Sequence, residues 1–211
     1  MYRDAEPRLS LLGALRLAGF KADGVQFFKG TDAAARRSFL QVLPLMLMGF
    51  IALAMLRPLT PFGADPDTFI MAFTATEAER GSHMAHWIGV NLLAQIVKWT
   101  LFLVVVREIM RIMEHGRYFS RFVQVFNWML VVRMMVVLLP LFLNLIGLVT
   151  LDAARIAVIT VSWMLLVYQW FGYRTALQIH WSLALALIVL ETILSIMIGG
   201  FALGALRQGG G

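Results

Sequence analysis

The sequence predicts an all-α fold: a polytopic bundle of about five transmembrane helices, preceded by an N-terminal cytoplasmic amphipathic helix. Three observations predict it. The residues AVILMFWYC make up 60% of the 211-residue chain and 14% of residues are charged, whereas soluble domains carry about 25% charged residues. The mean hydropathy is +0.79. The apolar residues also fall into separate runs, most of them close to the ~20 residues that a helix needs to cross a bilayer. This composition excludes a disordered chain and a soluble enzyme, and the absence of cysteine excludes a disulfide scaffold.

Residues 1–38 are predicted to form a cytoplasmic N-terminal segment. The apolar run from Leu9 to Phe20 is interrupted by Arg16, which is typical of a helix lying flat on the membrane surface. The alternative is a helix that docks onto another protein. Its expected apolar face consists of Leu11, Leu12, Leu15 and Ala18. Thr31 or Asp32 is expected to cap the helix that leads into the first span.

The transmembrane domain is predicted over residues 39–205 and is followed by a short tail, 206–211. Its five spans are expected at 39–57, 87–106, 122–149, 156–174 and 183–203. The third span is the longest and contains Pro140, which either kinks one long helix or splits it into a span and a re-entrant turn. A split would raise the helix count to six and reverse the position of the C-terminus.

The distribution of basic residues predicts the orientation of the spans. Twelve Lys and Arg residues lie in the N-terminal segment, between the second and third spans, and at Arg174, against four on the other side. The excess places the N-terminus in the cytoplasm and the C-terminus in the periplasm of a bacterial inner membrane. Aromatic residues near span ends, Trp87, Trp170, Tyr173 and Trp181, fit the membrane–water interface. The arginines expected to contact lipid head groups are Arg36, Arg37, Arg107, Arg111, Arg117 and Arg121.

Three ionisable residues inside the spans are the first candidates for a functional site, because charges within a bilayer are costly. Lys98, Arg133 and Glu191 each lie about 14–17 Å from the end of their span, near the middle of the bilayer. Glu191 is expected to pair with Lys98 or Arg133, which would reduce the cost of burying both partners. The second cation would then need water, backbone carbonyls, a lipid phosphate or an anionic ligand.

Polar residues at helical spacing accompany these charges and are expected to line the interior of the bundle. They are Asn91, Gln95, Gln124, Asn127, Ser162, Gln169 and Ser195. Three interpretations remain open: hydrogen bonds that fix the bundle, a path for a ligand or proton, and a seam for a partner membrane subunit.

No catalytic motif is recognisable: the sequence lacks a P-loop, an HExxH motif, a GxSxG elbow and a cysteine nucleophile. We therefore predict a protein that is not an enzyme, with no cofactor and no metal site. The basic pI of 10.3 is explained by residues at the membrane edges, so no nucleic-acid partner is expected. The expected partners are membrane lipids and a larger membrane-protein complex or a second copy of the chain.

Several segments resemble known membrane proteins. Residues 163–176 end in Gly172-Tyr173-Arg174-Thr175-Ala176, and together with the five-span topology they resemble the Yip family of small polytopic membrane proteins. Phe27-Phe28-Lys29-Gly30 and Phe126-Asn127-Trp128 are similar to segments of uncharacterised bacterial inner-membrane proteins. Yip proteins act in vesicle trafficking and bind small GTPases, but the N-terminal motifs for that role are not recognisable here. The resemblance implies a membrane bundle and no catalytic residue.

The function predicted from the sequence is therefore that of a non-catalytic scaffold or accessory subunit of a membrane complex that interacts with lipids. The alternative is a small carrier or channel with a charged site in the middle of the membrane for an anion or a proton.

Overall fold

The computed structural model describes residues 6–56 and 84–208, and every regular element in these two ranges is a helix. A short N-terminal pair is followed by five long helices and one further short turn of helix. The elements are α1 (Glu6–Ala18), η1 (Ala22–Phe27), α2 (Asp32–Leu56), α3 (Met84–Ile112), η4 (Gly116–Tyr118), α4 (Phe119–Leu145), α5 (Leu151–Leu177) and α6 (Trp181–Gln208).

Five of the described helices, α2 to α6, are long and apolar enough to cross a membrane. The prediction of an all-α bundle with five such helices is confirmed, and the structure is compatible with a multi-pass membrane protein. Pro140 lies inside α4, which continues as one helix to Leu145. The chain therefore follows the first of the two courses considered for Pro140, a single long helix.

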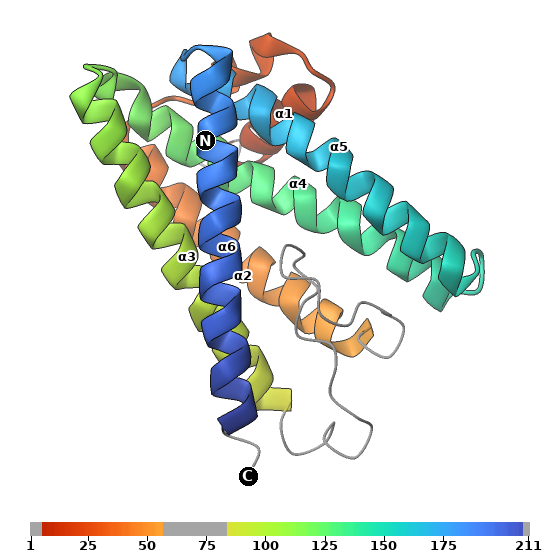
Figure 1. Ribbon diagram of the computed structural model, residues 1–211. Coiled ribbons are helices and arrows are strands. Elements are labelled where there is room, and N and C mark those ends of the chain that lie inside the picture. The colour runs from red at the N-terminus through yellow and green to blue at the C-terminus, as the bar shows by residue number, and fades with distance from the viewer. Residues whose placement is uncertain (1–5, 57–83, 209–211) are drawn as a thin grey trace.

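The five long helices form two groups (Figure 1). Helices α2, α4 and α5 run alongside one another, and α3 packs along α6. The groups meet near α1 and diverge away from it, so α6 and α5 enclose an angle (Figure 1). We call the end of the bundle that holds α1 the α1 end.

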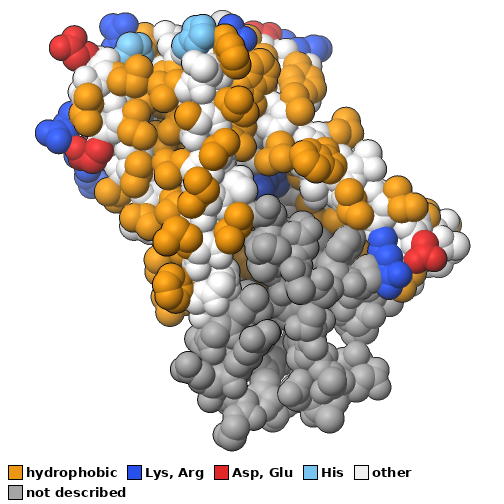
Figure 2. All heavy atoms as spheres, in the orientation of Figure 1, with side chains coloured by type: hydrophobic (Ala, Val, Ile, Leu, Met, Phe, Trp, Pro, Cys, Tyr) orange, Lys and Arg blue, Asp and Glu red, His pale blue; other side chains and the backbone are white. Residues whose placement is uncertain are grey.

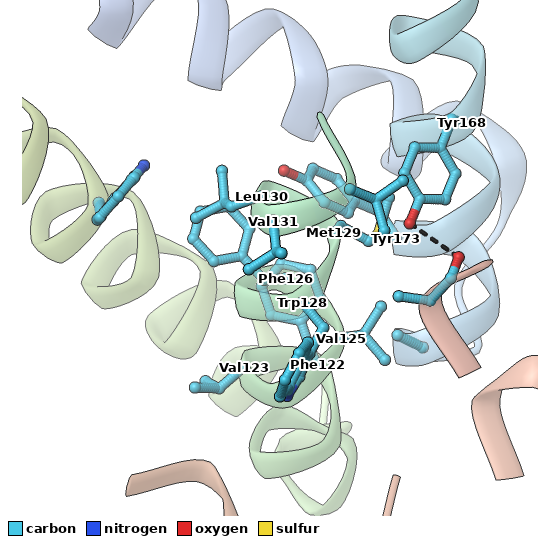
Figure 3. Packing of buried hydrophobic residues seen from close by; sticks show 14 of the residues in the cluster. Phe122, Val123, Val125, Phe126, Trp128, Met129, Leu130, Val131, Tyr168 and Tyr173 are labelled. Atoms are coloured by element: carbon cyan, nitrogen blue, oxygen red, sulfur yellow. Dashed lines mark hydrogen bonds between the residues drawn. The ribbon is translucent and has the colours of Figure 1, made fainter. Parts of the chain in front are cut away.

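Helix α4 forms the centre of the core. Each residue from Phe122 to Val132 is buried, because α2, α1 and α5 all pack against it. A helix that is apolar on every side needs such a central position. Figure 3 shows how its side chains, among them Phe126 and Met129, fill the space between the neighbouring helices.

Helix α1 packs against the bundle with a face other than the one that carries Leu12 and Leu15. Ala14 and Leu17 are fully buried, and the Tyr168 hydroxyl of α5 donates a hydrogen bond to the Ala14 carbonyl oxygen at 3.0 Å (Figure 3). Of the apolar face expected from the sequence, Leu11 and Ala18 pack against the core, whereas Leu12 and Leu15 are 45% and 49% exposed. Helix α1 thus has two apolar faces, one docked on α4 and α5 and one directed outward.

A close approach of two glycines joins α1 to η1. A Cβ atom on Gly24 would lie 2.6 Å from the Gly13 carbonyl oxygen, and one on Gly13 would lie 2.8 Å from the Gly24 carbonyl oxygen. An ion pair between Arg16 and Asp23 closes the same junction. The hydrogen bond that the Arg16 guanidinium donates to the Asp23 carboxyl lowers the pKa of this carboxyl below its usual value. The ion pair therefore stays charged at a lower pH than a free aspartate would.

We expect Gly24→Ala to loosen this junction, because the added methyl group meets backbone that cannot move without separating α1 from η1. Overpacking of this kind costs about 1–3 kcal/mol. The measurement is hydrogen–deuterium exchange over residues 6–28 in detergent micelles, where faster exchange is expected. Gly89→Ala is the matched control, since nothing lies within 4 Å of its Cβ position. Unchanged exchange in Gly24→Ala would show that the junction tolerates the methyl group.

Candidate functional site

Glu191 of α6 is the centre of a buried polar cluster. Its side chain is 7% exposed. One carboxylate oxygen, Oε2, accepts a hydrogen bond from the Tyr173 hydroxyl at 2.5 Å and another from the Gln169 amide at 2.8 Å. The other oxygen, Oε1, lies 3.4 Å from the Arg133 Nη1 atom. Helices α4, α5 and α6 therefore meet at one carboxylate.

Aromatic packing sets the position of the Tyr173 hydroxyl. The Tyr173 ring is 1% exposed, and its centroid lies 5.2 Å from that of Phe122 in an edge-to-face contact. The rings of Phe102 and Phe126 lie 5.9 Å and 6.3 Å away. Aromatic pairs at such separations fix ring orientation as well as burying area, so rings from α3 and α4 hold the tyrosine that binds Glu191.

The two cations of the cluster differ in exposure. Lys98 of α3 is buried at 9% exposure, and its charge interacts with those of Glu191 and Arg133. The Arg133 side chain is 23% exposed. Figure 2 shows basic side-chain atoms at the base of the angle between α6 and α5. Arg133 is therefore the most exposed charge of the three, and Lys98 and Glu191 are enclosed by packed helices.

The three charged residues of the cluster lie well inside the helices that carry them. Lys98 and Arg133 stand close to the midpoints of α3 and α4, and Glu191 lies ten residues into α6, or about 15 Å along it. The sequence predicts one depth for all three residues, and the structure brings them together. The predicted ion pair of Glu191 forms with Arg133, one of the two partners considered.

The other predicted polar residues have separate surroundings, apart from Gln169. Asn127, 2% exposed, donates to the Ser38 hydroxyl at 2.8 Å and so connects α4 to α2. Gln124 donates to the Ser120 carbonyl oxygen of its own helix at 3.1 Å. Ser162 and Ser195 also bond carbonyl oxygens within their own helices. These four residues stabilise helices and one helix pair without reaching the Glu191 carboxylate.

Two further predicted residues lie on α3. Asn91 is half-buried and makes an interaction of its own. Gln95 is half-buried, and its Nε2 atom is buried with no hydrogen-bond partner among the residues that the structure describes. The indole Nε1 of Trp99, one turn further along, is also buried with no hydrogen-bond partner among the described residues.

Tyr173 is the site residue that the sequence analysis placed wrongly. We expected its ring at the membrane–water interface, but it is buried and binds Glu191. A usable signal was present: Tyr173 follows Gln169 by four residues, so both lie on the same helix face. Of the other aromatic residues expected at span ends, Trp181 is 51% exposed. The Trp170 indole donates a hydrogen bond to the backbone carbonyl oxygen of Trp181 at 3.1 Å.

The six arginines predicted to contact lipid head groups have different surroundings at the α1 end, where Figure 2 shows many basic side chains. Arg36 and Arg107 are exposed, and Arg37 is half-buried. The Arg111 guanidinium pairs with Glu108 at 2.6 Å, and that of Arg117 lies 4.7 Å from the centroid of the Tyr118 ring.

Arg121 differs from the other five. Its side chain lies against Gly30, and its Nε atom is buried without a hydrogen-bond partner among the described residues. Lipid contact by all six arginines stays a prediction.

The N-termini of α2 and α4 are joined by hydrogen bonds. Thr31 caps α2 by accepting a hydrogen bond from the Ala34 amide at 3.3 Å, which settles the choice between Thr31 and Asp32. Asp32 instead accepts a hydrogen bond from the Ser120 hydroxyl of α4. With the Asn127–Ser38 contact, these bonds fix α2 against the helix that carries Arg133.

No protein-family model, no curated protein and no solved structure matches this chain significantly. The resemblance to the Yip family therefore stays a prediction, and the site is interpreted from its own geometry.

Proposed function

We propose that this multi-pass membrane protein binds an anion at the Lys98–Arg133–Glu191 cluster and carries it through the membrane. The observation that carries the proposal is the charge of the cluster. The ionisable side chains that the structure describes at this level of α3, α4 and α6 are two cations and one carboxylate. A buried positive charge in a bilayer favours a negatively charged ligand.

The hydrogen bonding of Arg133 supports the same proposal. Its contact with Glu191 is 3.4 Å long, which is longer than a strong charge-assisted hydrogen bond of about 2.7–2.9 Å. Glu191 is already bound closely by Tyr173 and Gln169. Since a guanidinium has five N–H donors and Arg133 uses one toward Glu191, the exposed part of Arg133 has capacity for an anion.

Uptake of a radiolabelled anion into liposomes that contain the purified protein tests the proposal. Phosphate is the first anion to use, followed by chloride. We expect Lys98→Gln to reduce uptake at least tenfold, because it removes a charge from the middle of the pathway. Arg107→Gln is the matched control, since it removes an exposed cation at the α1 end. Uptake by the wild-type protein no faster than in empty liposomes would contradict a carrier.

A second candidate is the scaffold or accessory subunit, with a larger complex or a second copy as partner. It is favoured by the bonding of the Glu191 carboxylate, because hydrogen bonds and an ion pair to α4 and α5 suit a purely structural link between helices. Purification from native membranes in mild detergent, followed by mass spectrometry, tests it. A stoichiometric protein partner supports the subunit, whereas recovery of the chain alone with a bound anion supports the carrier.

The orientation is part of the proposal. We propose that the α1 end faces the cytoplasm of a bacterial inner membrane, since most of the described basic residues of the N-terminal segment and of the connection between α3 and α4 lie there. The absence of enzymatic activity is likewise our expectation from the sequence.

A further inference from the structure

Two buried hydrogen-bond donors on α3 have no acceptor among the described residues: Gln95 Nε2 and Trp99 Nε1. An unsatisfied donor of this kind costs about 1–3 kcal/mol. Surplus donors occur rarely inside folded proteins, and each calls for an explanation.

The two donors lie next to the proposed anion site. Gln95 precedes Lys98 by three residues and Trp99 by four, and residues at both spacings are neighbours on a helix surface. The side chains of Gln95, Lys98 and Trp99 thus form one group, which we call the α3 donor patch. Helix α3 packs along α6, which carries Glu191.

The chemistry of the patch indicates one class of ligand. The Lys98 ammonium and the Trp99 indole N–H donate and do not accept, and the atom of Gln95 that has no partner is its amide nitrogen, also a donor. The carboxylate oxygens of Glu191 on α6 are already occupied by Tyr173, Gln169 and Arg133. A ligand that satisfies this arrangement needs negative charge and several acceptor atoms. Chloride supplies one atom, and a proton supplies no acceptor.

We propose that the α3 donor patch binds the oxygens of a phosphate group, with Gln95 and Trp99 as ligand-binding residues beside Lys98. This inference rests on the proposed function and specifies its substrate class. The phosphate group can come from free inorganic phosphate or from the head group of a lipid such as phosphatidic acid. Each neutral donor adds a hydrogen bond to a charged acceptor, and such bonds are among the strong ones.

The test is isothermal titration calorimetry of the full-length protein in detergent micelles with three probes: inorganic phosphate, dioctanoyl phosphatidic acid and chloride. Trp99→Phe removes the indole N–H and keeps an aromatic ring, and Gln95→Met removes the amide and keeps the chain length. We expect each variant to weaken binding of the phosphate group about tenfold. Trp163→Phe on α5 is the control, because Trp163 is 68% exposed, and it should bind like the wild type.

The outcomes separate the two proposals. Tenfold weaker binding in Trp99→Phe or Gln95→Met, with Trp163→Phe unchanged, supports the donor patch. Because Gln95 is only half-buried, Gln95→Met provides a folded variant if Trp99→Phe does not fold.

Binding of phosphatidic acid alone supports a lipid source, and binding of both phosphate probes supports a free phosphate group. If the wild type binds phosphate and both variants bind it equally well, the donor patch is wrong and the anion site stands. If none of the three probes binds the wild type, both proposals are wrong.

Discussion

Replacing Glu191 by alanine should destabilise the protein by about 3–5 kcal/mol, the cost of removing one member of a buried ion pair. The variant removes the acceptor of the Tyr173, Gln169 and Arg133 donors at once. The guanidinium is then left partly buried without its counter-charge. Glu191→Gln should cost less, about 1–3 kcal/mol, because the amide keeps one acceptor oxygen.

Thermal unfolding in detergent micelles, followed by far-ultraviolet circular dichroism, measures both changes. Ser195→Ala is the matched control on the same helix, since the Ser195 hydroxyl bonds the backbone carbonyl of Glu191 and not its carboxylate. It should change stability by about 0.5 kcal/mol or less. A Glu191→Ala protein as stable as the wild type would show that the carboxylate does not hold the helices together.

The second large effect is expected at Tyr173, where two variants separate the hydroxyl from the ring. Tyr173→Phe should cost about 1.5–3 kcal/mol, because it removes a hydrogen bond to a buried carboxylate. Tyr173→Ala also removes a ring packed against Phe102, Phe122 and Phe126. Its cost should reach about 3–5 kcal/mol, as for other buried aromatic side chains.

A double-mutant cycle tests whether the hydroxyl acts through Glu191. If it does, the effects of Tyr173→Phe and Glu191→Gln should fall short of additivity by about 0.5–3 kcal/mol, as is usual for residues in contact. Tyr118→Phe provides a comparison, because Tyr118 lies half-buried at the α1 end beside Arg117. Full additivity of Tyr173→Phe and Glu191→Gln would indicate that the two groups stabilise the fold independently.

The sequence was sufficient for the fold class because the bilayer imposes a simple rule on composition. Long apolar runs must become helices that satisfy their own backbone, and the described residues contain five of them. The depth of Lys98, Arg133 and Glu191 followed from counting residues along helices, since the rise per residue is constant.

What the sequence could not provide depends on contacts between helices. The choice of Arg133 as the partner of Glu191 is set by how α4 and α6 approach each other. Tyr173 was placed at a span end because the fourth span was expected to finish at residue 174, whereas α5 continues to Leu177. The docking face of α1 was predicted only in part: Leu11 and Ala18 pack against the core as apolar residues, but Ala14 was missed because so small a side chain carries little hydrophobic signal. Small residues matter there because they allow close packing.

The place of Glu191 on the last long helix also has a consequence for the synthesis of the protein. Arg133 precedes Glu191 by 58 residues, so at about 5–20 residues per second the ribosome adds the carboxylate roughly 3–12 s after the guanidinium. During this interval α3 and α4 carry their charges without the acidic partner that the finished bundle gives them. The final arrangement of the earlier helices therefore has to wait for α6, and a nascent chain that ends before Glu191 carries Arg133 without its acidic partner.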